Sequence, residues 1–160
     1  MKKLSLLLSV ITLLYSSQSV KAQTRSHTNQ TDKLKLIGHR GAMGLLPENT
    51  IPGFLKAIEL GVDGIELDVA ISGDGQVVLS HEPWFRHDIC LTPEGKSIAK
   101  EREKEHRIYE MTYKQIARYD CGSVQHPRFP GQQTKPLAKP LLREVVQEAE
   151  ALITANEYDP

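Results

Sequence analysis

Short apolar runs and turn signals alternate along the chain from residue 34 onward and predict a mixed α/β fold. Leu34–Gly38 is an apolar run ended by glycine, which predicts a buried strand. Residues 50–60 carry apolar side chains at i, i+3, i+4 and i+7 behind a threonine N-cap and a proline, so they predict a helix that ends at Gly61. The same spacing predicts a second helix over Leu141–Thr154.

Between these helices, residues 64–70 alternate strictly, with Ile65, Leu67 and Val69 on one face of a predicted strand. A second apolar strand, 76–80, follows the turn signal of residues 72–75. So short a link favours an antiparallel hairpin, whereas parallel strands normally need a crossover of about a dozen residues. The pattern leaves both arrangements open, and in both of them His81 lies near Asp68: the two residues lie opposite one another in the hairpin, and both lie at C-terminal strand ends in the parallel pair.

From Glu82 to about Gln133 the periodicity loosens, because prolines recur and residues 100–107 form a dense run of mixed charges. We interpret residues 83–133 as a surface insertion and the charge run as a solvated helix face. A short helix over Thr112–Tyr119, capped by Thr112, is predicted inside it.

The start of the chain has a different composition. Residues 1–22 combine two early lysines, the apolar run Leu4–Tyr15 and small residues ending at Ala22, which predicts a cleaved signal peptide rather than a membrane anchor. Residues 23–32 are polar and predict a flexible leader, so the folded domain should occupy residues 33–160. We therefore expect a periplasmic or secreted protein.

Export to an oxidising compartment bears on the two cysteines. Cys90 and Cys121 could form one disulfide there, or they could be two small buried thiols. The sequence gives no Cα separation, so both possibilities stay open.

Charge and length narrow the choice of partners. The 160 residues hold 20 Lys+Arg against 20 Asp+Glu, which leaves room for one domain and no bias toward nucleic acid or acidic membranes. The overall charge therefore names no partner, and we expect no nucleic acid and no stable membrane anchor.

Polar side chains cluster at the predicted strand ends. Glu66 and Asp68, at i and i+2, project to one side of a strand with Cα atoms about 6.5–7 Å apart, close enough to bracket a hard cation. His39 and Arg40 follow the first strand, and His81 follows the strand after the turn. An arginine fork, a divalent ion and two imidazoles suit phosphodiester cleavage, although each residue alone is more often structural.

These residues, in this order and spacing, resemble the glycerophosphodiester phosphodiesterase family. The matching segments are His39-Arg40-Gly41, Pro47-Glu48-Asn49-Thr50, Glu66-Leu67-Asp68-Val69, Asp74-Gly75 and His81. The resemblance implies the N-terminal portion of a TIM-like (β/α)8 barrel, which favours barrel strands over the hairpin. It also implies that 83–133 is the small insertion that such enzymes carry after the strand with the second histidine.

Carried over to this chain, the resemblance implies a metal-dependent enzyme that hydrolyses glycerophosphodiesters to glycerol 3-phosphate and an alcohol. His39 and His81 would be the acid/base pair, Arg40 a phosphate ligand, and Glu66 and Asp68 ligands of Ca²⁺ or Mg²⁺. Glu48 could touch the site or only organise its loop, and no chemistry is assigned to a further set of histidines, His27, His87, His106 and His126.

Two departures from the family accompany this resemblance. Glu82 follows the second histidine where the family usually has aspartate, and Glu157 is only a weak candidate for the family's third metal carboxylate. Complete barrels of this type contain about 250 residues. We therefore expect either an exported hydrolase whose coding sequence was cut short or a noncatalytic remnant that binds phosphodiesters weakly.

Overall fold

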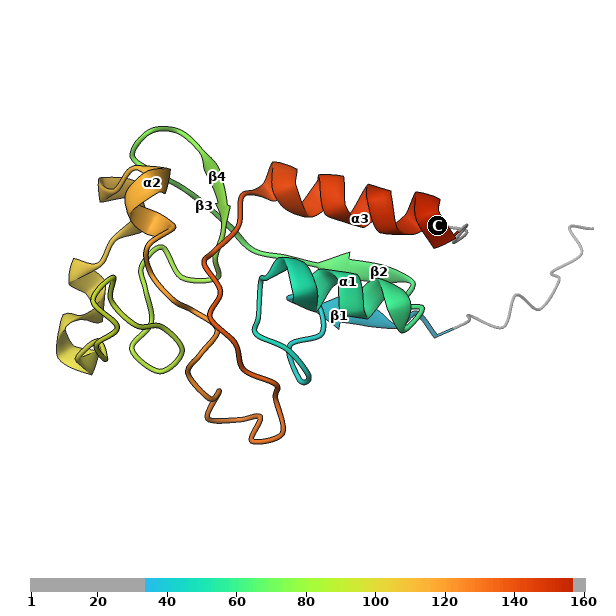
Figure 1. Cartoon of the computed structure of the whole chain (residues 1–160), viewed down its shortest axis with the longest axis horizontal. Helices are drawn as coiled ribbons and strands as arrows, with labels where there is room; N and C mark the ends of the chain where they lie inside the picture. Colours follow the sequence, from blue (N-terminus) through green and yellow to red (C-terminus); the bar gives the residue numbers. More distant parts are fainter. Residues whose placement is uncertain (1–33, 157–160) are drawn as a thin grey trace, which may run out of the picture. The chain divides into compact units, whose positions relative to one another are not determined.

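The computed structural model describes residues 34–156, so the predicted signal peptide and leader lie outside the described residues. Strands, helices and two 3-10 helices follow one another as shown in Figure 1. In chain order they are β1 Ile37–His39, α1 Ile51–Glu59, β2 Gly64–Glu66, β3 Val69–Ile71, β4 Val77–Leu79, η1 Lys100–Glu105, η2 Ile108–Glu110, α2 Tyr113–Ile116 and α3 Leu142–Asn156.

The first three elements form a β-α-β unit. β1 and β2 pair in parallel, and α1 makes the crossover that parallel pairing requires. The predicted helix is confirmed: the Thr50 hydroxyl accepts a hydrogen bond from Gly53 N at 3.3 Å, and Gly61 follows the helix with a φ of 71°. The register places His39 beside Glu66.

The prediction that the first strand is buried is wrong in one respect. Leu36 and Ile37 are exposed, and of the three β1 residues only Gly38 is buried. β1 pairs with β2 along one edge, and within residues 34–156 no strand pairs with its other edge.

The predicted strand over residues 64–70 is interrupted at Leu67 and Asp68, and its two halves belong to different sheets. β3 pairs with β4 as an antiparallel hairpin, with Val69 opposite Leu79. Parallel barrel strands, which the resemblance favoured, are therefore wrong for this pair, because the link of five residues between β3 and β4 can close only a hairpin. Val69 also leaves the predicted apolar face and is exposed.

The segment between Glu82 and Leu141 contains the larger apolar cluster of the described residues. Phe85 stacks on Tyr119 at a centroid distance of 3.7 Å, and β4 contributes Val78 to the same cluster. Within it, Cys90 and Cys121 are joined by a disulfide, which settles the alternative that the sequence left open. The loosened periodicity therefore reflects irregular backbone around a packed core, and the boundaries of an insertion at 83–133 stay a prediction.

The other predicted helices in the second half of the chain are also present. α2 begins after Thr112, whose hydroxyl and backbone form a capping box with Gln115. The charge run forms the exposed 3-10 helix η1. α3 packs against α1, as Figure 1 shows, and Val145 joins a second apolar cluster with Phe54 and Leu79.

The described residues contain two two-stranded sheets and do not close a barrel. The assignment of this segment to the N-terminal portion of a (β/α)8 barrel therefore remains a prediction. No helix within residues 34–156 combines the length and the apolar character needed to cross a bilayer.

Candidate functional site

The end of β1 brings His39 and Arg40 to the carboxylate of Glu66. Because His39 and Glu66 are register partners in the parallel pair, their side chains leave the sheet at the same place. The Arg40 backbone N–H donates to Glu66 Oε2 at 3.0 Å, and His39 Nε2 lies 3.7 Å from the same oxygen. The His39 side chain is 57% exposed, so solvent and small ligands can reach it.

The backbone turns sharply after His39, and this turn directs the Arg40 side chain inward. Arg40 has a φ of 51°, and Gly41 follows with a φ of 83°. A Cβ at Gly41 would lie 2.7 Å from the backbone carbon of Gly53, so only glycine lets the turn pack against the start of α1. Steric contact with α1 therefore explains why the third position of the His-Arg-Gly motif is glycine.

Arg40 is only 8% exposed and lies between two carboxylates. Its Nη1 donates to Glu48 Oε1 at 3.0 Å, and its Nε lies 3.3 Å from Asp68 Oδ2. A buried guanidinium requires such partners, because an unpaired buried charge costs several kcal/mol or more. The arginine predicted as a phosphate ligand is thus fixed beside one of the predicted metal ligands.

Asp68 is held by a second residue of the same loop. Asn49 Nδ2 donates to Asp68 Oδ2 at 3.0 Å, and Asp68 N donates to Asn49 Oδ1 at 3.2 Å. Asn49 has a φ of 53°, a conformation that asparagine tolerates better than most residues. The Pro-Glu-Asn-Thr segment therefore places two side chains at the site and one helix cap.

His81 lies directly after β4. Ser80 N donates to the Asp68 backbone oxygen at 3.0 Å, so Asp68 stands opposite Ser80 and not, as the hairpin interpretation proposed, opposite His81. His81 Nδ1 contacts Glu82 Oε1 at 2.9 Å, and the ring is 39% exposed. Direct contacts thus link His39, Arg40, Glu66 and Asp68, and the hairpin backbone connects them to His81.

Glu48 is buried, and an arginine and a histidine from distant parts of the chain approach its carboxylate. Arg86 Nη1 lies 3.7 Å from Glu48 Oε1, and His126 Nε2 lies 3.6 Å from Glu48 Oε2. Sequence reasoning assigned no chemistry to His126, because it lies in a stretch interpreted as loop. In the structure it is 2% exposed, and its burial lowers the pKa of the imidazole below its usual value.

A buried lysine that the sequence did not single out lies near the same cluster. Residues 121–140, which we call the 121–140 segment, form irregular backbone between α2 and α3 and end at Pro140. Lys139 precedes this proline, and its side chain is almost completely buried. Burial lowers the pKa of its amine to about 8, and the nearby carboxylates of Glu48, Asp68 and Glu82 oppose this effect only in part.

The carboxylates of Glu66 and Asp68 suit a divalent cation. The hydrogen bonds described above use Oε2 of Glu66 and Oδ2 of Asp68, while both side chains keep contact with solvent. Mg²⁺ is commonly bound through one or two carboxylates together with waters and substrate phosphate oxygens. The pair fits that role, although residues 34–156 include no group of three histidine, cysteine or acidic side chains that could hold a metal ion without further ligands.

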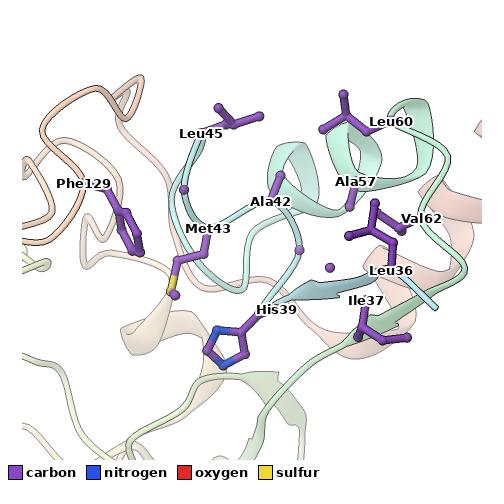
Figure 2. A pocket seen from close by; sticks show the side chains of 13 residues that line it. Leu36, Ile37, His39, Ala42, Met43, Leu45, Ala57, Leu60, Val62 and Phe129 are labelled. Carbon is purple, nitrogen blue, oxygen red and sulfur yellow. The ribbon is translucent and has the colours of Figure 1, made fainter. Parts of the chain in front are cut away.

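An apolar groove of about 390 Å³ begins at His39. Figure 2 shows the imidazole on its rim, with Met43 and Phe129 on one side and Ile37 on the other. Arginine, lysine and acidic residues do not line this groove, so the groups suited to bind phosphate lie outside it.

The sequence profile of the glycerophosphoryl diester phosphodiesterase family matches residues 39–159, from the first predicted catalytic histidine onward. The chain belongs to this family. A glycerophosphodiester phosphodiesterase of Caldanaerobacter subterraneus is 34% identical to it over 105 residues, which cover 66% of this chain and 38% of the relative. The chain thus spans about two fifths of the length of that relative.

Solved structures agree with the family assignment. A crystal structure of a candidate glycerophosphoryl diester phosphodiesterase from Silicibacter pomeroyi is 30% identical, with a TM-score of 0.66 over 74% of this chain and 41% of that one. An Oleispira antarctica phosphodiesterase, solved with the product sn-glycerol-3-phosphate, is 24% identical, with a TM-score of 0.54 over 74% of this chain and 41% of that chain. This last likeness concerns the fold alone.

Proposed function

We propose that this chain carries the entrance half of the active site of an exported, metal-dependent phosphodiesterase that releases glycerol 3-phosphate and an alcohol from glycerophosphodiesters. One observation supports this most strongly: a buried arginine joins a histidine-bearing strand end to two neighbouring carboxylates. Arg40 does so through its backbone N–H to Glu66 and its guanidinium to Asp68. Family membership adds support for the substrate class.

Arg40 is the phosphate ligand in this proposal. Glu48 and Asp68 fix the guanidinium in one orientation, so little side-chain entropy is lost when a phosphate oxygen binds beside Asp68. Glu66 and Asp68 would hold a Ca²⁺ or Mg²⁺ ion, which supplies positive charge to the phosphate oxygens.

His39 and His81 act as the acid/base pair. One imidazole removes a proton from the attacking oxygen as its bond to phosphorus forms. The other gives a proton to the alcohol oxygen as the phosphorus–oxygen bond to that alcohol breaks. Both rings are exposed enough to exchange protons with solvent between turnovers.

We also propose the domain arrangement behind this chemistry. Residues 33–160 correspond to the N-terminal portion of a (β/α)8 barrel, with 83–133 as an insertion, and residues 1–22 are removed on export to the periplasm or the medium. The likeness to solved structures over 41% of their length supports the first part. Intact-mass measurement of secreted protein tests the second part, and a mature chain that still begins at Met1 would contradict it.

The enzymatic test uses the purified chain, Ca²⁺ or Mg²⁺, and glycerophosphocholine. We expect glycerol 3-phosphate to be released, and His39→Ala to abolish the release. His87→Ala serves as a matched control, because His87 pairs with Glu103 in the 83–133 segment and not with the site. If the wild-type chain turned over glycerophosphocholine no faster than His39→Ala does, the enzymatic proposal would be contradicted.

One observation favours a second candidate function, binding of phosphodiesters without turnover. The described residues supply two carboxylates for a metal ion and no group of three. Calorimetric binding of glycerophosphocholine, lost in Arg40→Lys and unaccompanied by glycerol 3-phosphate, would select this alternative.

A further inference from the structure

His126 is buried where the 121–140 segment meets the loop that precedes α1. Its ring is 2% exposed, and it shares a small cavity with Glu48, Cys121 and Gln132. Gln132 Nε2 donates to the backbone oxygens of Met43 and Leu46 at 2.7 and 3.0 Å, so the segment is attached to this loop by a second side chain.

The hydrogen bonding of the ring fixes which nitrogen carries the proton. The Arg128 backbone N–H donates to His126 Nδ1 at 3.1 Å, so Nδ1 is the acceptor. In a neutral imidazole the proton is then on Nε2. That nitrogen lies 3.6 Å from Glu48 Oε2, just beyond hydrogen-bond distance, and both atoms are buried without a hydrogen-bond partner among the described residues.

The other oxygen of Glu48 contacts Arg40. Oε1 accepts from Arg40 Nη1 at 3.0 Å, and Arg86 Nη1 approaches it to 3.7 Å. A carboxylate held at one oxygen only can rotate about its terminal bond, whereas contacts at both oxygens fix its plane. The orientation of Arg40 beside Asp68 therefore depends on what holds Oε2.

We propose that His126 is a positioning residue for the phosphodiester site: its Nε2–H is the donor that faces the unpartnered Glu48 oxygen and orients the carboxylate, and Glu48 holds the Arg40 guanidinium beside Asp68. The expected effect of His126 on turnover rests on the proposed function. Its expected effect on the orientation of Arg40 rests on the geometry alone. The inference makes the 121–140 segment a supporting part of the site, whereas the sequence analysis interpreted residues 83–133, which include His126, as a surface insertion.

The chemistry of the pair explains why a histidine fits this position. Arg40 and Arg86 already balance the Glu48 charge, so a neutral N–H donor completes the cluster without adding a buried charge. Burial lowers the pKa of the imidazole, while Glu48 and Asp88 act in the opposite direction and Arg86 and Arg128 act with burial. The neutral ring with its Nε2 proton is therefore the form present at neutral pH.

The test compares two variants of the full chain. His126→Leu keeps apolar volume and removes the donor, whereas His126→Gln keeps an amide N–H at nearly the same reach. His106→Leu is the matched control, because His106 contacts the Tyr119 hydroxyl at 2.8 Å and does not contact Glu48. The first readout is the Arg40 Nε–H signal in ¹H–¹⁵N spectra without substrate, together with its exchange with water. The second readout is turnover of glycerophosphocholine at saturating metal.

We expect His126→Leu to speed Arg40 Nε–H exchange and to lower kcat roughly ten- to a hundredfold, as is usual when a residue that orients a site is lost. His126→Gln should restore both, and His106→Leu should change neither. If wild-type chain shows no turnover, the proposed enzymatic function fails, and the Arg40 signal alone decides on His126. The inference would be overturned if the Arg40 Nε–H signal of His126→Leu, and its exchange with water, matched those of the wild-type chain. The inference would also be overturned if His126→Leu and His126→Gln lost turnover equally and in proportion to the fall in their unfolding midpoints.

Discussion

Asn49 and Asp68 exchange two hydrogen bonds: the Asn49 amide nitrogen donates to the Asp68 carboxylate, and the Asp68 backbone N–H donates to the Asn49 amide oxygen. The pair connects the loop before α1 to the point at which the chain leaves β2 and enters β3. Since Arg40 approaches the same Asp68 oxygen, the loop and the arginine together fix this carboxylate.

Asn49→Ala should lower the free energy of unfolding by about 2 kcal/mol, because it removes two hydrogen bonds, one of them to a charged group. Urea unfolding followed by circular dichroism measures this change. A double-mutant cycle with Asp68→Ala should give a coupling energy of about 1 kcal/mol. If the losses of unfolding free energy in the two single variants simply add in the double variant, the hydrogen bond between the Asn49 and Asp68 side chains contributes no stability.

Removal of the disulfide by Cys90→Ala with Cys121→Ala should destabilise the chain. The two cysteines are 31 residues apart, and closing a loop of this size in the unfolded state corresponds to about 3–4 kcal/mol. Urea midpoints with and without dithiothreitol measure the effect. Dithiothreitol should shift the wild-type midpoint toward that of the variant and leave the variant unchanged. Two free thiols in native wild-type protein would contradict the bridge.

Lys139→Met should stabilise the chain below pH 8 and lose this advantage as the pH rises. The folded chain holds the pKa of the amine at about 8 and the unfolded chain near 10.5, so between these values the unfolded state binds one proton more. Wild-type stability therefore rises with pH across that window. The cost that Met removes below pH 8 is about 3 kcal/mol, at about 1.36 kcal/mol per pH unit.

Unfolding in EDTA buffers at pH 7, 9 and 10.5 measures this difference. Lys114→Met is the control, since Lys114 is exposed on α2 and its replacement should change stability equally at each pH. An advantage of Lys139→Met that persists unchanged at pH 10.5 would show that packing, and not the buried charge, causes the effect.

Glu66→Gln and Asp68→Asn should each weaken binding of Ca²⁺ or Mg²⁺ about tenfold or more, because each amide replaces a charged oxygen ligand by a neutral one. Isothermal titration with each ion measures the affinity. Glu150→Gln, an exposed replacement on α3, should leave it unchanged. Equal affinity in all three variants would mean that the ion binds elsewhere, and EDTA should abolish any turnover of the wild-type chain.

Local patterns predicted the helices well. Thr50, Pro52 and Gly61 mark the bounds of α1 through their own backbone preferences, and Thr112 marks the start of α2 as its N-cap. These signals need no information about distant residues. Strand pairing does need it, and the alternation over residues 64–70 concealed a change of sheet between Glu66 and Val69.

The site residues also divide into those that local motifs predicted and those whose placement depends on tertiary contacts. His39, Arg40, Glu66 and Asp68 were found from motif spacing, and the structure joins them by direct contacts. Their catalytic and metal-binding roles stay predictions. His126 and Lys139 were missed, because both lie in irregular backbone whose burial depends on residues far away in the sequence.

The sequence by itself determined the family, the presence and the starts of the helices, and the identity of the polar residues at the strand ends, since these follow from neighbouring residues and short motifs. Only the tertiary structure decided that Arg40 faces inward between Glu48 and Asp68, that β2 and β3 belong to different sheets, and that Cys90 and Cys121 are joined. Each of these depends on contacts between residues distant in the chain or on which edge of a strand finds a partner. Burial and pairing of that kind are properties of the packed chain and leave no periodic trace in the sequence.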